Sequence, residues 1–165
     1  MHKLRIVHRD IKPDNVMLSD ETPQAIAKTC DFGTARQVNE NNEFVADKTE
    51  TINQTVAGSG YYMSPEMKME EPNGTKTDVW SFAITIGVVL GLSNLNATNV
   101  PKFIKQTASG QNDMILFKNG ILLSPIMKNL LHDMLIVDVK KRSTMQQVMD
   151  HRYFTDSQET YTSGY

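Results

Sequence analysis

The feature that most constrains this sequence is an uncharged stretch at residues 79–101. Its dense apolar part is shorter and ends at Leu92, where asparagine and serine follow at once. A helix that spans a bilayer needs about 20 apolar residues, so we expect no membrane span here. A helix that is apolar on all sides is instead buried among other elements. The sequence therefore predicts a central core helix at 79–91, capped by Thr77 or Asp78.

The segments around this helix predict an α+β fold that is mainly α. Two short strands, at 16–18 and 25–30, flank the turn cluster SDETPQ, which indicates a hairpin with a long loop. The other predicted elements are a short strand at 4–7, an irregular polar loop at 36–57, a helix opened by Ser124 and Pro125, and a last helix opened by Ser143 or Thr144.

The polar run HRDIKPDN lies between two of the predicted strands and concentrates ionisable side chains in one loop. Asp31, in the triplet DFG, follows the next strand, so the hairpin is expected to bring Asp10, Asn15 and Asp31 together. The oxygens of Asn15 and Asp31 suit Mg²⁺, which binds few protein groups and retains phosphate and water ligands. Asp10 would then be left to orient a hydroxyl, with Lys12 adding positive charge. Phosphoryl transfer requires this combination of positioning and charge neutralisation.

Three motifs in order, HRDIKPDN, DFG and SPE at 64–66, resemble the catalytic loop, magnesium loop and end of the activation segment of eukaryotic protein kinases. DVWSFA at 78–83 resembles the start of the family's buried central helix, and MLIVDVKKRST at 134–144 resembles its closing segment. The resemblance covers about residues 1–154. It implies the large, C-terminal lobe of a kinase domain, with a short β-hairpin and several helices. We expect the tail 155–165 to be flexible.

The resemblance implies a serine/threonine protein kinase that uses ATP and Mg²⁺ to phosphorylate protein hydroxyls. Asp10 is implied as the catalytic base, and Asn15 and Asp31 as the magnesium ligands. Lys12 is implied to contact the transferred phosphate, and its place in DIKPDN resembles the serine/threonine branch rather than the tyrosine-specific one. Cys30 falls where the family lines the nucleotide pocket, and we expect it to be a small half-buried apolar residue there.

Further residues have implied supporting roles. We expect His8 to pack and hydrogen-bond under the loop, and the resemblance implies that Asp78 holds the loop's backbone. Glu66 and Arg142 are expected to form a buried ion pair, whose breakage would leave an uncompensated charge. Ser59 falls where the serine/threonine branch has a threonine or serine near the catalytic residues, as part of the substrate platform.

The resemblance also implies control by phosphorylation. Arg9 directly precedes Asp10, and Thr55 lies four residues before Ser59, the spacing that the family uses for a regulatory phosphate. Arg36 matches a second basic position. A phosphate on Thr55 would bring nearly two negative charges, which Arg9 and Arg36 could bind through charge-assisted hydrogen bonds. The alternative is that Thr55 merely sits in a flexible loop.

The chain begins almost at the catalytic loop, so we expect the small lobe to be absent and this chain alone to be inactive. A non-catalytic scaffold or decoy module and a partial gene model are the alternatives. The net charge of −2 argues against nucleic acid as the main partner. The single cysteine, Cys30, cannot form an internal disulfide, so we expect a reducing, cytoplasmic location. The protein substrate and the oligomeric state do not follow from the sequence.

Overall fold

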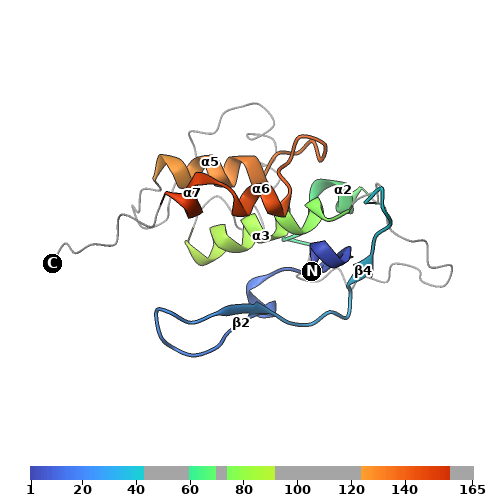
Figure 1. The fold of residues 1–165 in the computed structure, drawn as a ribbon. Coiled ribbons are helices and arrows are strands. Elements are labelled where there is room, and N and C mark those ends of the chain that lie inside the picture. The colour runs from blue at the N-terminus through green and yellow to red at the C-terminus, as the bar shows by residue number, and fades with distance from the viewer. Residues whose placement is uncertain (43–59, 70–73, 92–123, 157–165) are drawn as a thin grey trace.

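The computed structural model describes residues 1–42, 60–69, 74–91 and 124–156, and Figure 1 shows how they are arranged. One central helix separates the other helices from the strands (Figure 1). In chain order the elements are the 3-10 turn η1 (His2–Leu4), β1 (Ile6–Val7), the 3-10 turn η2 (Pro13–Asn15), β2 (Val16–Leu18), β3 (Ala27–Thr29), β4 (Arg36–Gln37), α2 (Pro65–Lys68), α3 (Lys76–Val89), α5 (Pro125–Met134), α6 (Met145–Met149) and α7 (Arg152–Thr155).

The hydrophobic core forms where α3 packs against α5 and α6. Trp80 and Ile84 are fully buried on α3, as are Leu131 and Met134 on α5, and Val148 adds a buried side chain from α6. Burial of apolar surface is the main stabilising term in folding, so this layer holds the helices together. The predicted central core helix is confirmed. Within the described segments, no helix has the length and apolarity that a membrane crossing requires.

The start of α3 differs from the prediction. The helix begins at Lys76, so Thr77 and Asp78 lie inside its first turn and do not cap it. Both side chains are fully buried and bind partners elsewhere in the fold: Thr77 Oγ1 donates to Glu66 Oε1 at 3.0 Å, and Asp78 accepts from the loop after β1. The predicted cap is wrong because both oxygens serve these long-range contacts.

The predicted hairpin is confirmed. Strands β2 and β3 pair antiparallel, with Val16 opposite Thr29 and Leu18 opposite Ala27. Ser19 N–H donates to the carbonyl of Ile26 at 3.0 Å and closes the loop between them. The second strand, β3, covers only Ala27–Thr29 and is shorter than the predicted 25–30.

A second antiparallel pair was not predicted. Strand β1 pairs with β4, with Ile6 opposite Gln37 and Val7 opposite Arg36. The predicted irregular loop at 36–57 is therefore wrong at its first two residues, and residues 43–57 lie outside the described segments. Each strand has only two residues, which is too short for an alternating apolar pattern to show.

The starts of the C-terminal helices match the sequence signals. Ser124 Oγ accepts from Met127 N–H at the start of α5, and Thr144 forms a capping box with Gln147 at the start of α6. Helix α7 follows and was not predicted. It ends at Thr155, so the predicted tail begins too early, and residues 157–165 lie outside the described segments.

Candidate active site

The loop between β1 and η2 holds Asp10 in a defined orientation. Asp10 Oδ2 accepts hydrogen bonds from Lys12 Nζ at 2.7 Å and from Asn15 Nδ2 at 3.1 Å. Asn15 Nδ2 also donates to the Asp10 backbone carbonyl at 2.8 Å, which fixes the turn of the loop. No described residue donates a hydrogen bond to Asp10 Oδ1, and the side chain is 14% exposed. One carboxylate oxygen is therefore held by the protein and the other can accept a hydroxyl proton.

Lys12 brings a positive charge to the same position. Its hydrogen bond to Asp10 raises the pKa of the ammonium group, with further support from the charges of Asp14 and Asp31, although desolvation opposes the shift. Lys12 therefore remains cationic at neutral pH. A fixed cation beside the proton acceptor can stabilise negative charge on a transferring group.

Asp31 lies directly after β3 and begins the next loop. Its backbone is in the left-handed region, with φ 61°, and its Oδ1 accepts from Gly33 N–H at 3.2 Å. Cys30 N–H donates to the Asn15 carbonyl at 2.9 Å, so the hairpin joins the two loops directly. The structure thus brings the backbone before Asp31 beside Asn15. Within the described residues, no hydrogen bond joins the side chains of Asp31 and Asn15.

The oxygen atoms available here fit Mg²⁺. Asn15 donates through Nδ2, so its Oδ1 remains an acceptor, and Asp31 is an exposed carboxylate. The described residues contain no group of three or more histidine, cysteine or acidic side chains that could hold a metal ion. Mg²⁺ commonly takes one or two protein oxygens and completes its shell with phosphates and water, so two ligands suffice.

His8 lies beneath the loop and joins it to the segment after β3. The side chain is fully buried, and its Nε2 donates to the Cys30 carbonyl at 3.0 Å. Its ring contacts the ring of Phe32, with centroids 4.9 Å apart, and Thr34 Oγ1 donates to the His8 carbonyl at 2.9 Å. Cys30 is half-buried at this junction. These contacts position the Asp31 loop relative to the Asp10 loop.

Asp78 on α3 holds the loop backbone from below. Its Oδ2 accepts from His8 N–H at 2.8 Å and its Oδ1 from Arg9 N–H at 2.9 Å. Arg9 has φ 68°, a left-handed conformation that is unfavourable for a residue with a side chain. Such strain persists only where the surroundings enforce it, and the buried Asp78 carboxylate supplies that restraint.

The sequence analysis missed His2. Its Nε2 lies 2.8 Å from Asp78 Oδ2, and because a carboxylate only accepts, His2 donates this hydrogen bond. The side chain is 16% exposed and comes from η1. The two residues are 76 positions apart, so no local pattern could have revealed the contact.

Arg9 and Arg36 lie close enough to repel each other. Burial lowers the pKa of the Arg9 guanidinium, the positive charge of Arg36 lowers it further, and Asp78 partly offsets both effects. Adjacent guanidinium groups of this kind favour the binding of an anion between them. Thr55 and Ser59 lie outside the described residues, so the structure does not place the predicted regulatory and substrate-platform positions.

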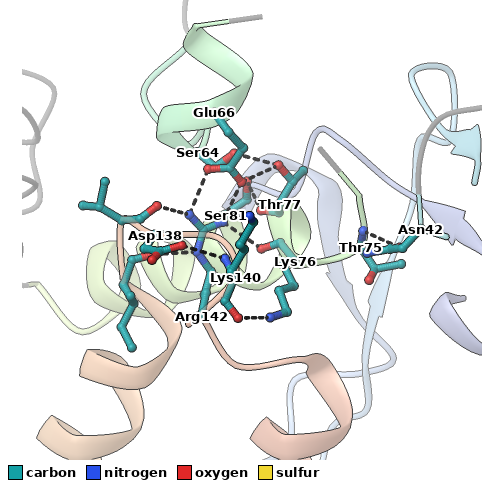
Figure 2. A network of polar contacts seen from close by, with 12 residues as sticks. Asn42, Ser64, Glu66, Thr75, Lys76, Thr77, Ser81, Asp138, Lys140 and Arg142 are labelled. Atoms are coloured by element: carbon teal, nitrogen blue, oxygen red, sulfur yellow. Dashed lines mark hydrogen bonds and ion pairs between the residues drawn. The ribbon is translucent and has the colours of Figure 1, made fainter. Parts of the chain in front are cut away.

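Glu66 and Arg142 meet in a buried network, shown in Figure 2. Arg142 donates to Glu66 Oε1 at 2.6 Å and to Oε2 at 2.9 Å, and the side chains are 0% and 3% exposed. Burial opposes ionisation of Glu66, but the hydrogen bonds and charge of Arg142 outweigh it and lower the pKa of the carboxyl group. Arg142 also donates to three backbone carbonyls, those of Lys76, Ile136 and Val137.

This network joins three parts of the chain. Glu66 is in α2, Arg142 precedes α6, and the Arg142 guanidinium lies over the Trp80 ring of α3, 5.0 Å from its centroid. Ser64 Oγ and Thr77 Oγ1 share a further hydrogen bond of 2.6 Å. The hydrogen bond between Ser64 and Thr77 therefore fixes the segment before α2 to α3, the helix that carries Asp78.

Comparison with known proteins places these motifs in context. A family model described as the protein kinase domain matches residues 1–154. Serine/threonine-protein kinase atg1 of Dictyostelium discoideum is 30% identical over 154 residues, which cover 93% of this chain and 21% of that protein.

Two other relatives show the same pattern. Calcium-dependent protein kinase 10 of Oryza sativa subsp. japonica is 31% identical over 151 residues, which cover 91% of this chain and 23% of that protein. Serine/threonine-protein kinase PKH2 of Saccharomyces cerevisiae is 29% identical over 160 residues, which cover 94% of this chain and 14% of that protein. The chain thus spans less than a quarter of the length of each of these three relatives.

Proposed function

This chain belongs to the protein kinase family, and we propose that it carries the phosphoryl-transfer residues of a serine/threonine protein kinase that uses ATP and Mg²⁺. The observation that supports this most directly is the carboxylate of Asp10. Lys12 and Asn15 bind one of its oxygens, and the other is available to a substrate hydroxyl. The names of the relatives, which are serine/threonine and calcium-dependent protein kinases, support the choice of protein hydroxyls as acceptors.

In the proposed reaction, the substrate hydroxyl hydrogen-bonds to Asp10 Oδ1 and its oxygen forms a bond to the γ-phosphorus of ATP. The bond from that phosphorus to the bridging oxygen breaks, ADP leaves, and the hydroxyl proton passes to Asp10. Asn15 keeps the carboxylate oriented, and Lys12 stabilises charge on the transferring group. Bound Mg²⁺ would supply charge neutralisation at the phosphates, with Asn15 and Asp31 as its protein ligands.

We also propose that residues 1–154 form the large, C-terminal lobe of the kinase domain. A central buried helix, flanking helices and two small antiparallel sheets support this assignment. The half-buried Cys30 is proposed to line the nucleotide pocket, because it lies directly before Asp31 at the end of β3. A cytoplasmic location remains a prediction from the sequence.

Regulation by phosphorylation of Thr55 is part of the proposal. Burial lowers the pKa of Arg9 and the positive charge of Arg36 lowers it further, so a phosphate would offset the repulsion between the two guanidinium groups. Binding of the phosphate would tie the segment that carries Thr55 to the loop that carries Asp10. Ser59 is proposed as a substrate-platform residue by the same family pattern.

Labelled ATP, Mg²⁺ and a generic basic protein substrate test the proposed activity in the full-length protein. Asp10→Asn should lower kcat by about 10²–10⁴-fold while circular dichroism stays unchanged. The control, Asp150→Asn, makes the same charge change at the exposed residue that directly follows α6 and should retain activity. If phosphate incorporation is absent, or does not depend on Asp10, the enzymatic proposal is wrong and the scaffold or decoy alternative is favoured.

A further inference from the structure

The residue at the N-cap position of α3, Thr75, does not cap the helix with its own side chain. The first N–H groups of any helix have no acceptor within the helix. In α3, Thr77 N–H reaches the Gly74 carbonyl at 3.1 Å and Asp78 N–H reaches the Thr75 carbonyl at 3.2 Å. Thr75 takes the cap position, but its side chain makes no capping hydrogen bond with any described residue. The N–H of Thr75 therefore needs an acceptor from elsewhere.

Asn42 supplies that acceptor from 33 positions away in the sequence. Its Oδ1 accepts from Thr75 N–H at 3.1 Å, as Figure 2 shows. Asparagine is among the best residues for accepting from the N–H groups at a helix start. The backbone of Asn42 has φ 62°, and asparagine is one of the few residues that tolerate this region. A turn from Asn39, whose carbonyl accepts from Asn42 N–H at 3.0 Å, holds it there.

Gly74 provides the space for this contact. A Cβ atom at Gly74 would lie 2.2 Å from the Asn42 backbone oxygen and 2.5 Å from its Nδ2. Real Cβ atoms do not approach other atoms so closely, and the nearest obstacle is backbone, which cannot rotate away. Any larger residue at Gly74 would displace Asn42. The side chain of Asn42, its backbone conformation and the glycine opposite it are thus three separate features that favour one contact.

We propose that Asn42 caps α3 across the chain and is a positioning residue for the segment 31–42. Thr34 ties the start of this segment to His8, and Asn42 ties its end to the helix that carries Asp78. The loop that carries Asp10 and the segment that carries Asp31 are then both anchored to α3. The effect of this contact on phosphoryl transfer rests on the proposed function, whereas the cap itself does not.

Amide hydrogen exchange in the full-length protein tests the cap. Asn42→Ala should speed exchange at Thr75 N–H roughly 5- to 30-fold, the effect of losing one helix cap. Asn42→Asp keeps the accepting oxygen and adds a negative charge that a helix start favours, so it should restore most of the protection. Asn41→Ala, a change of the same type at the neighbouring residue, should leave Thr75 unchanged.

The same spectra test the positioning role. Val38 N–H donates to the Arg5 carbonyl at 2.8 Å and reports on the segment that Asn42 anchors. Its exchange should also rise in Asn42→Ala and recover in Asn42→Asp. Unchanged exchange at Thr75 in Asn42→Ala would overturn the cap, and a change at Thr75 without one at Val38 would overturn the positioning role.

Gly74→Ala offers an independent route to the same state. It should expose Thr75 N–H about as much as Asn42→Ala does, and the double variant should show no further increase, because both changes break one contact. Additive effects would contradict the proposal. If Gly74→Ala does not fold, the variants at Asn42 still decide the question.

The catalytic consequence is measured through Mg²⁺. In Asn42→Ala the Mg²⁺ concentration for half-maximal phosphoryl transfer should rise about fivefold, because Asp31 is less well positioned to bind the ion. At saturating Mg²⁺ kcat should stay near its original value, and Asn42→Asp should recover the original midpoint. An unchanged midpoint would overturn the effect on catalysis. If the protein lacks kinase activity, the exchange results still test the cap, so the two failures are distinguishable.

Discussion

The buried pair of Glu66 and Arg142 allows a prediction whose size follows from the structure. Both side chains are almost fully buried and share two hydrogen bonds, so removal of either leaves an uncompensated charge in the core. Glu66→Ala and Arg142→Ala should each lower the free energy of unfolding by about 3–5 kcal/mol. The double variant should cost much less than the sum, because neither charge then remains alone.

The two single variants should respond differently to pH. In Arg142→Ala the stranded carboxyl group of Glu66 can take up a proton, which costs about 1.4 kcal/mol for each pH unit above its ordinary pKa. Lowering the pH from 7 to 5 should therefore recover up to about 2.7 kcal/mol of the loss. Glu66→Ala leaves a guanidinium that does not lose its proton, so its loss should stay constant over this range.

Urea denaturation of the two single variants and the double variant measures the coupling. A second cycle on Arg5 and Glu40 provides the matched control, because that pair is 3.3 Å apart but 52% and 85% exposed. We expect a coupling of about 0–1 kcal/mol for the exposed pair and a clearly larger one for Glu66 and Arg142. Additive losses at the buried pair, or equal pH responses of its single variants, would refute this reasoning.

Four further predictions concern the site and its supports. In the protein without substitutions the pKa of Glu66 is lowered from its ordinary value of 4.5. The ionised carboxylate therefore stabilises the fold above pH 4.5, and acid denaturation should show this stabilisation being lost as the pH falls through the folded-state pKa. Asp31→Ala should abolish Mg²⁺-dependent transfer of labelled phosphate without changing circular dichroism. His2→Ala should speed exchange of the two loop amides that Asp78 binds about fivefold, and His2→Gln should partly restore them. Thr55→Ala should prevent activation by phosphorylation and Arg9→Ala should uncouple it; full activity in a Thr55→Ala protein whose loop is unphosphorylated by mass spectrometry would contradict this.

Local signals in the sequence predicted the starts of two helices. Ser124 with Pro125 marked the start of α5, and Ser143 or Thr144 that of α6; the structure selects Thr144, which caps α6 together with Gln147. These residues act within one turn of the chain. The hairpin was predictable for the same reason, because its strands flank a single turn cluster. Where the residues that contact each other are only a few positions apart, the sequence pattern alone was sufficient to predict the element.

Contacts between distant segments were not predictable in the same way. Thr77 and Asp78 are residue types that cap helices, but their oxygens bind partners 11 or more positions away. Asn42 caps α3 from another segment. Residue type shows what a side chain can bind, whereas the folded chain determines which partner lies within hydrogen-bond distance. The contact between His2 and Asp78 was missed on the same grounds.

Polar residues on α3 show how such contacts specify an arrangement that apolar packing alone would leave open. Thr77 and Ser81 are four positions apart, so they lie on one face of α3. Thr77 donates to Glu66, and Ser81 Oγ donates to the Tyr62 carbonyl at 2.8 Å. Apolar contacts are not directional, whereas a buried hydroxyl without a partner destabilises the fold. These hydroxyls therefore select the face of α3 that meets residues 60–69. With that face fixed, Asp78 must point toward the loop that carries Asp10.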